Sequence, residues 1–177
     1  MSKLKVIYEP NGKAKEYAEL AANLFETCEH ACKYCYAPFV MNRKPEEFFT
    51  NAKARKNIIP RLIKDAEHLK SIGEQREILL SFTSDVYQSD SKICVDTTKA
   101  AIAVLFNKGL NVTVLTKGGN CSLRDIDLFE TYKDQFRYGA TLVFSNDSDS
   151  LFYEPFAALT SERIKALDII HKRGIRT

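Results

Sequence analysis

Apolar and polar positions alternate with two different periods along the chain. Four short runs of mainly apolar residues predict strands, at residues 21–25, 77–82, 111–115 and 139–144. Between and after these runs, apolar residues recur every three or four positions, which predicts helices over residues 60–72, 97–108, 123–129 and 160–173. Ser122 is a suitable N-cap for the third helix, and a glycine follows each of the other three, as is typical of helix ends.

Strands that alternate with amphipathic helices are typical of parallel βαβ units, so we expect an α/β fold with a parallel sheet. A closed eight-stranded barrel needs ~200 residues or more, and 177 residues therefore predict a partial, incomplete TIM-type barrel. Residues 174–177 resemble the opening of a fifth strand. We expect a single domain over residues 1–177, either a truncated barrel or an open sheet that another chain completes.

Polar or thiol-bearing side chains follow every predicted strand. Cys28 comes after the first strand, Ser84 and Asp85 after the second, Lys117 after the third and Ser145 after the fourth. In parallel α/β folds the carboxyl ends of the strands lie on one edge, where ligands bind. The sequence therefore predicts a functional site on that edge.

Composition says more about where the protein is located than about the reaction it carries out. The formal net charge of +3 permits a nucleic-acid partner without requiring one. The longest wholly apolar run, residues 100–106, is far shorter than the ~20 residues of a membrane span, and no segment resembles a signal peptide. We therefore expect a cytoplasmic location, where clustered cysteines more often bind metal or carry out redox chemistry than form disulfides. No P-loop or dinucleotide glycine fingerprint is present, which argues against nucleotide hydrolysis and nicotinamide chemistry.

Three of the five cysteines, Cys28, Cys32 and Cys35, form a C-x3-C-x2-C motif. One interpretation is a zinc site with His30 as fourth ligand, although structural zinc sites usually join two separated ligand pairs. A second is a redox dithiol of Cys32 and Cys35, for which a third cysteine is superfluous. A third is a four-iron cluster, where three thiolates leave one iron open to a small molecule.

The cysteine motif, with Tyr34 before its third cysteine and a predicted strand in front of it, resembles the signature of radical S-adenosylmethionine (radical SAM) enzymes. The sequence Thr83-Ser84-Asp85, followed about thirty residues later by Thr116-Lys117, is similar to the spore photoproduct lyase branch of that superfamily. Glu154-Pro155 before the last helix is similar as well. The resemblance covers nearly the whole chain.

The resemblance implies a [4Fe-4S] cluster on the three cysteines and S-adenosylmethionine as second cofactor. Such enzymes cleave this cofactor reductively to a 5′-deoxyadenosyl radical, which abstracts hydrogen from a substrate, and they need an electron donor such as flavodoxin or ferredoxin. The cofactor contacts that the resemblance implies are Tyr34, Tyr36, Ser84, Asp85, Lys117 and Ser145. Ordinary roles stay open beside them: packing for the tyrosines, turn capping for Ser84 and Asp85, and solvation for Lys117.

One departure concerns the substrate. Spore photoproduct lyase has a hydrogen-donating cysteine directly before its threonine-serine-aspartate sequence, and this chain has Phe82 there. We therefore predict a different substrate or hydrogen donor, and a nucleic-acid substrate is suggested by kinship alone. The basic run from Lys53 to Lys64 is more typical of a solvated helix face. The alternative function is a non-enzymatic zinc or iron–sulfur module that binds nucleic acid or protein.

Overall fold

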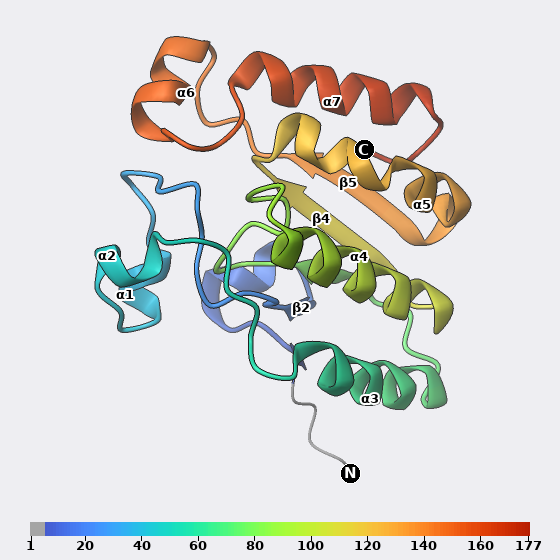
Figure 1. Ribbon diagram of the computed structural model, residues 1–177. Helices are drawn as coiled ribbons and strands as arrows, with labels where there is room; N and C mark the ends of the chain where they lie inside the picture. The colour runs from blue at the N-terminus through green and yellow to red at the C-terminus, as the bar shows by residue number, and fades with distance from the viewer. Residues whose placement is uncertain (1–5) are drawn as a thin grey trace.

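Five strands form one sheet in the order β1-β2-β3-β4-β5 in the computed structural model, which describes residues 6–177 (Figure 1). The strands are β1 (Ile7–Tyr8), β2 (Leu20–Ala22), β3 (Ile78–Leu80), β4 (Val112–Thr116) and β5 (Phe136–Ala140). β1 runs antiparallel to β2, and the three other neighbouring pairs are parallel. The predicted α/β fold of an unclosed, partial barrel is confirmed.

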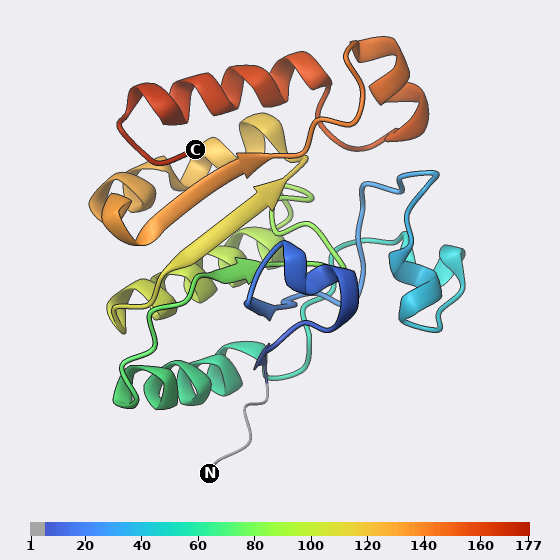
Figure 2. The same cartoon turned by 180° about the vertical axis from the view of Figure 1, so that it is seen from behind.

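The helices that cover this sheet lie on one of its faces (Figure 1). They are α3 (Ile58–Ser71), α4 (Lys92–Asn107), α5 (Ile126–Thr131) and α7 (Thr160–Lys172). The other helical segments are α1 (Ala37–Val40), α2 (Pro45–Phe48), α6 (Asp147–Tyr153), η1 (Gly12–Glu16), η2 (Gly119–Asp125) and η3 (Lys133–Gln135). Figure 2 shows the other face, where the segment containing η1 crosses strands that helices do not cover. No helix within residues 6–177 has the length and apolar content that a membrane span requires.

Alternation along the strands explains the one-sided core. Phe136 of β5 is fully buried, stacked on Phe129 of α5 with ring centroids 4.2 Å apart and edge-on to Phe106 of α4 at 5.8 Å. The next residue, Arg137, points to the uncovered face and is exposed. Burial of a side chain of this size stabilises the fold by roughly 1.5–3 kcal/mol, so the helices are held on the face that presents such side chains.

The predicted element boundaries were partly wrong. The fourth parallel strand is β5 at Phe136–Ala140 rather than residues 139–144, because its inward-facing aromatic side chains come earlier in the sequence. Residues 37–54, which lie outside the predicted strands and helices, contain α1 and α2. Ser122 lies within η2 and does not cap α5, since its hydroxyl group donates to the Gly119 carbonyl oxygen at 2.6 Å. The antiparallel strand β1 was not predicted.

The chain end carries the predicted opening of a further strand. Arg176 forms a parallel bridge with Arg137, and the Tyr138 N–H donates to the Arg176 carbonyl oxygen at 2.9 Å. This bridge continues the parallel order past β5.

Candidate functional site

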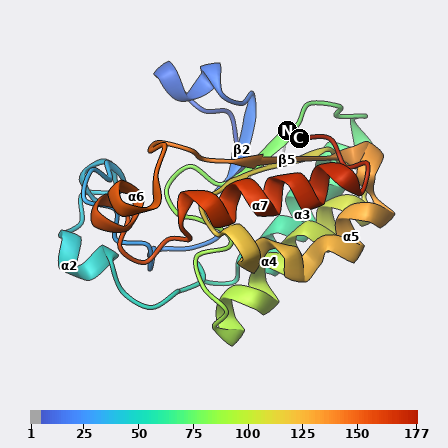
Figure 3. The same cartoon turned by 90° about the horizontal axis from the view of Figure 1, so that it is seen from above.

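The cysteine loop, residues 28–35, lies beyond the carboxyl ends of the parallel strands, at the same end of the molecule as α2 and α6 (Figure 3). Cys28 and Cys32 are only 8% and 7% exposed, and Cys35 is half-buried. The Cys28 N–H donates to the Phe48 carbonyl oxygen at 3.1 Å, which ties the loop to α2. Ala31 has a left-handed backbone (φ 47°), a conformation that reverses the chain between the first two cysteines.

Burial controls the protonation of these thiols. It raises the pKa of Cys28 to about 12, with a further contribution from the Asp85 carboxylate. It also raises the pKa of Cys32 to about 11 and the pKa of Cys35 above its usual value. The backbone N–H groups of Asp85 and His30 donate to the Cys28 sulfur and oppose part of this shift. Ionisation of these thiols at neutral pH therefore requires a cationic centre beside them, as metal binding supplies.

The three thiols of the cysteine loop suit the thiolate ligand set of an iron–sulfur cluster. Within residues 6–177, no three Cys, His, Asp or Glu side chains converge as the ligands of one metal ion would. His30 is buried with its Nδ1 3.6 Å from Asp85 Oδ2, and burial lowers the pKa of its imidazole. A cubane places each thiolate on a different iron atom, so its ligands need not meet at one point. Three thiols on one partly buried loop suit that group.

Asp85 connects the segments that follow the parallel strands, beneath the cysteine loop. We call this edge of the sheet, where the parallel strands end, the rim. Its Oδ1 accepts from the Thr116 hydroxyl at 2.6 Å and from the Tyr87 N–H at 2.8 Å. Its Oδ2 accepts from the Lys117 N–H at 2.6 Å. The carboxylate therefore joins the segments that follow β3 and β4, which is a structural role. Its predicted cofactor contact stays a prediction.

Tyr36 and Ser84 both contact the segment around the end of β3. The Tyr36 hydroxyl donates to the Phe82 carbonyl oxygen at 2.9 Å. Ser81 Oγ donates to the Ser84 carbonyl oxygen at 2.8 Å and lies 3.2 Å from Ser84 Oγ. Asn23, which directly follows β2, accepts hydrogen bonds through its Oδ1 from the N–H groups of Phe82 and Thr83. These bonds hold the segment after β3 against the end of β2. The structure thus brings two predicted contact residues from distant segments to one place.

A buried charge cluster connects the cysteine loop to α7. Glu154 is fully buried, and its carboxylate accepts a hydrogen bond from the Tyr34 hydroxyl. Arg163 Nη2 lies 2.6 Å from Glu154 Oε2, and Lys117 Nζ lies 3.8 Å from Oε1. Burial and the hydrogen bond to Glu154 raise the pKa of the Tyr34 phenol. Lys117 and Arg163 therefore share the Glu154 carboxylate.

The two cations contact Glu154 differently. Arg163 is the closer partner of Glu154, and its guanidinium also donates to the carbonyl oxygens of Ala158 and Thr141. The Lys117 side chain is more exposed, at 20%, and its ammonium lies 5.7 Å from the centre of the Tyr34 ring. A partly exposed ammonium of this kind can bind the carboxylate of a ligand.

The two positions after Lys117 require glycine because neighbouring segments lie too close to leave room for a Cβ atom. A Cβ atom at Gly118 would lie 2.5 Å from the Tyr87 carbonyl oxygen. Gly119 has a left-handed backbone (φ 51°), and its Cβ atom would lie 2.5 Å from that of Ala158. These residues let the segment after β4 pass between its neighbours, which explains a Lys-Gly-Gly sequence without phosphate-binding spacing.

Ser145 was predicted to lie at a strand end, and this prediction is wrong. It is exposed in the connection after β5, five residues beyond Ala140. Phe144 brings this connection to the cysteine loop instead, with its ring centroid 6.1 Å from that of Tyr34. Sequence reasoning also missed Arg163. Its spacing from Thr160, Ala166 and Ile170 places it on the buried face of α7, and an arginine at such a position indicates a buried acidic partner.

A separate hollow lies at the opposite ends of the strands. It has a volume of about 300 Å³ and is lined by residues 15–19 with Glu77, Thr113 and Arg137. Glu77 there accepts hydrogen bonds from Thr113, Arg137 and Arg176. Because Glu77 is already paired with two arginines and no cysteine lines this hollow, we assign the chemistry to the cysteine loop.

Parallel strands, helices on one face and cysteines on the carboxyl rim define an open α/β half-barrel. No family model matches the sequence. Over 162 residues, 90% of this chain, it is 29% identical to an uncharacterized protein of Methanocaldococcus jannaschii, of which the match covers 58%.

Among solved structures, the fold is that of spore photoproduct lyase. A mutant of that lyase with bound AdoMet and dinucleoside spore photoproduct matches with a TM-score of 0.68 at 19% identity, over 97% of this chain and 46% of the lyase. The lyase complexed with dinucleoside spore photoproduct gives a TM-score of 0.68 at 18% identity, over 98% of this chain and 46% of that chain. The predicted resemblance in fold to this radical SAM branch is confirmed. The chain spans about half the length of these relatives.

Proposed function

We propose that this chain is a radical SAM enzyme whose Cys28, Cys32 and Cys35 hold a [4Fe-4S] cluster with one iron open to S-adenosylmethionine. Together the two cofactors supply reductive cleavage of the sulfonium bond and a 5′-deoxyadenosyl radical that abstracts hydrogen from a substrate. The observation that carries the proposal is the position of three partly buried thiols where the parallel strands end, at the same edge as the partly exposed ammonium of Lys117.

The surrounding residues have separate tasks in this proposal. Lys117 binds the carboxylate of S-adenosylmethionine by charge. Tyr34 and Tyr36 offer aromatic surface to its adenine, and Ser84 offers a hydroxyl group to its polar atoms. Asp85 holds the Lys117 backbone in place through its hydrogen bond. Burial of the cysteine loop keeps water from the cluster and lowers the local dielectric constant.

Repair of spore photoproduct by the donor cysteine of the lyase is not the reaction that we expect of the proposed enzyme. Phe82 occupies the position of the donor cysteine and has no thiol hydrogen to return to a product radical. We therefore expect another substrate, with a nucleic-acid compound as one candidate, or another hydrogen donor.

Anaerobic reconstitution with iron and sulfide tests the proposal. The protein should turn brown with ~4 iron atoms per chain and release 5′-deoxyadenosine when S-adenosylmethionine and dithionite are added. Cys32→Ala should lose both the cluster and the cleavage. Cys121→Ser, which alters a half-buried cysteine outside the loop, is the matched control and should retain both.

Two results would overturn the proposal. Normal cleavage in Cys32→Ala would remove that cysteine from the ligand set. A colourless protein with one tightly bound zinc ion and no nucleoside product would instead support the zinc module.

A further inference from the structure

Arg163 of α7 has the largest fully buried side chain within residues 6–177. Its guanidinium contacts the connection between β5 and α7 at three points. Nε donates to the Ala158 carbonyl oxygen at 2.7 Å, Nη1 donates to the Thr141 carbonyl oxygen at 3.0 Å, and Nη2 lies 2.6 Å from Glu154 Oε2. A buried guanidinium is stable only when its partners replace the water that it has lost, so all three contacts matter for this position.

The connection that Arg163 fixes also holds two segments of the proposed cofactor site. The Lys33 N–H, in the cysteine loop, donates to the Tyr153 carbonyl oxygen at 2.8 Å. The Ala158 N–H donates to the Lys117 carbonyl oxygen at 3.0 Å. The contacts of Arg163 are therefore transmitted to the cysteine loop and to the segment after β4.

The three partners of the Glu154 carboxylate contact it unequally. Oε1 accepts a hydrogen bond from the Tyr34 hydroxyl, and Oε2 contacts the Arg163 guanidinium. Lys117 Nζ lies 3.8 Å from Oε1, which is beyond hydrogen-bond distance. Each carboxylate oxygen thus has a closer donor than the ammonium. Charge holds Lys117 near Glu154, but this carboxylate does not use the hydrogens of its ammonium.

We propose that Arg163 and Glu154 are positioning residues that keep the Lys117 ammonium beside the Tyr34 ring and available to the carboxylate of a ligand. The Tyr34 hydroxyl and the Arg163 guanidinium occupy the two oxygens of Glu154, so Lys117 stays near this carboxylate without binding it tightly. The inference rests on the proposed function, in which the ligand is S-adenosylmethionine. It gives the Tyr34 hydroxyl a task separate from that of the aromatic ring.

A purely structural role of the same cluster leads to a different result. If the cluster only held the fold together, removal of one partner would damage the site, and removal of a second would not repair it. In the positioning role, removal of Arg163 or of the Tyr34 hydroxyl releases one oxygen of Glu154, and the Lys117 ammonium then donates to it. An ammonium bound in this way is withdrawn from the ligand until the charge of Glu154 is removed as well.

The test measures the affinity of S-adenosylmethionine for the reconstituted protein by equilibrium dialysis, with the cluster oxidised so that the cofactor is not cleaved. Arg163→Met should weaken this affinity by about tenfold, because the ligand loses one charge-assisted hydrogen bond. Tyr34→Phe keeps the aromatic ring and should weaken the affinity in the same direction. It serves as the test where Arg163→Met does not fold. Iron content per folded chain should match the wild type.

Double variants separate positioning from structure. Glu154→Gln keeps the size of the side chain and removes its charge. Combined with Arg163→Met or with Tyr34→Phe, it leaves no carboxylate at this position to withdraw Lys117. The affinity for S-adenosylmethionine should then return to within about threefold of the wild-type value.

Matched controls remove the same chemical groups elsewhere. Arg173→Met removes an arginine at the end of α7 that pairs with Glu130. Tyr132→Phe removes a hydroxyl group that donates to Asn107 Oδ1 at 2.9 Å. Both variants should bind S-adenosylmethionine like the wild type.

The other outcomes overturn one or both proposals. Wild-type affinity in Arg163→Met and Tyr34→Phe, with an intact cluster, would overturn the positioning role and leave the proposed function standing. Weakened affinity that neither double variant recovers would also overturn it, since a purely structural role gives that result. A wild-type protein that forms no cluster, or that binds no S-adenosylmethionine, would overturn both proposals together.

Discussion

The helix-covered core and the cysteine rim are both buried, but they are held together differently. In the core, side chains such as Leu105 and Phe136 are fully buried among other apolar groups. At the rim, Glu154 and Arg163 are equally buried and carry charge. The contribution of a buried apolar side chain to stability depends on how well it fills the volume around it. The contribution of a buried charge depends on one particular partner. The rim should therefore be less tolerant of single changes than the core.

The largest effect should come from removing one member of the buried ion pair. Glu154→Ala leaves the Arg163 guanidinium buried without its carboxylate, and we expect the free energy of unfolding to fall by about 3–5 kcal/mol. The double variant Glu154→Leu with Arg163→Met removes both charges and should recover much of this loss. Urea unfolding measures both.

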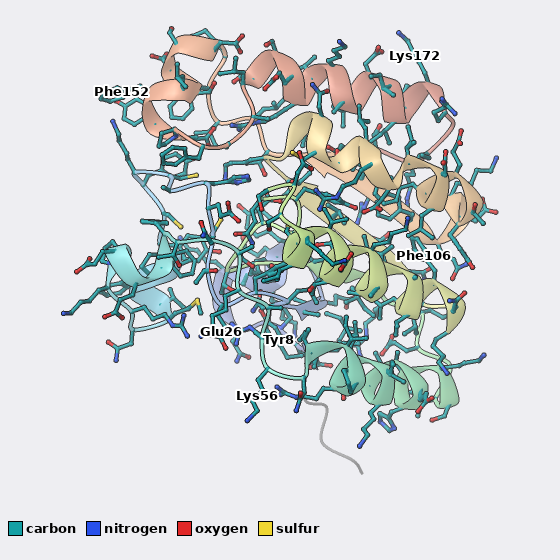
Figure 4. All side chains as sticks on the ribbon, viewed as in Figure 1. Tyr8, Glu26, Lys56, Phe106, Phe152 and Lys172 are labelled. Atoms are coloured by element: carbon teal, nitrogen blue, oxygen red, sulfur yellow. The ribbon has the colours of Figure 1, made fainter. Side chains whose placement is uncertain are left out.

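The exposed pair Lys172–Asp168 of α7 is the control, and Lys172 projects from that helix in Figure 4. Asp168→Ala should leave the free energy of unfolding nearly unchanged, since exposed pairs contribute little. If Glu154→Ala and Asp168→Ala lowered the free energy of unfolding equally, the buried ion pair of the rim would be no more sensitive to mutation than an exposed one.

A core truncation should cost slightly less and should leave the rim intact. Leu105→Ala creates a cavity between α4 and the sheet, with an expected loss of about 3 kcal/mol. The volume-conserving Leu105→Met should cost less than about 1.5 kcal/mol. Iron content per folded chain, measured after reconstitution, should match the wild type in both. Loss of iron in Leu105→Ala would show that core packing also positions the cysteine loop.

A smaller effect is expected where backbone segments touch at the rim. Gly118→Ala places a Cβ atom against the Tyr87 carbonyl oxygen, and overpacking of this kind costs roughly 1–3 kcal/mol. Gly139→Ala is the matched control, because its new Cβ atom meets only the mobile end of the Leu115 side chain, at 3.0 Å. Thermal unfolding of both variants should rank Gly118→Ala as the less stable. The reverse order would contradict the close approach at Gly118.

An effect of comparable size, which appears only at alkaline pH, concerns the thiol protons of the metal-free chain. The folded chain keeps the Cys28 proton up to a pKa of about 12, whereas an unfolded cysteine loses its proton near pH 8.5. The stabilisation is therefore complete below about pH 8.5 and is lost as the pH rises toward the folded-state pKa, at up to about 1.4 kcal/mol per pH unit. Urea unfolding between pH 8 and pH 10 should show a shallower decline in Cys28→Ala. Identical declines would contradict a raised pKa at this thiol.

Local patterns predicted the parts of the molecule whose causes lie within a few residues. The strands β3 and β4 and the helices α3 and α7 follow from apolar periodicity. The cysteine motif is compact enough to be read directly, and the strand order places Ser84, Asp85 and Lys117 on one rim. Periodicity failed at β5, where the strand starts three residues before the predicted run because its aromatic side chains find partners on α4 and α5.

The sequence by itself therefore determined the parallel α/β half-barrel and the position of its cysteine loop, because both depend on short-range periodicity and spacing. Only the tertiary structure decided which charges meet. Tyr34, Lys117 and Arg163 converge on Glu154 from segments far apart in the chain. Nothing local distinguishes a buried arginine with a partner from a solvated one. The difference arises when packing excludes water and each buried charge must be matched.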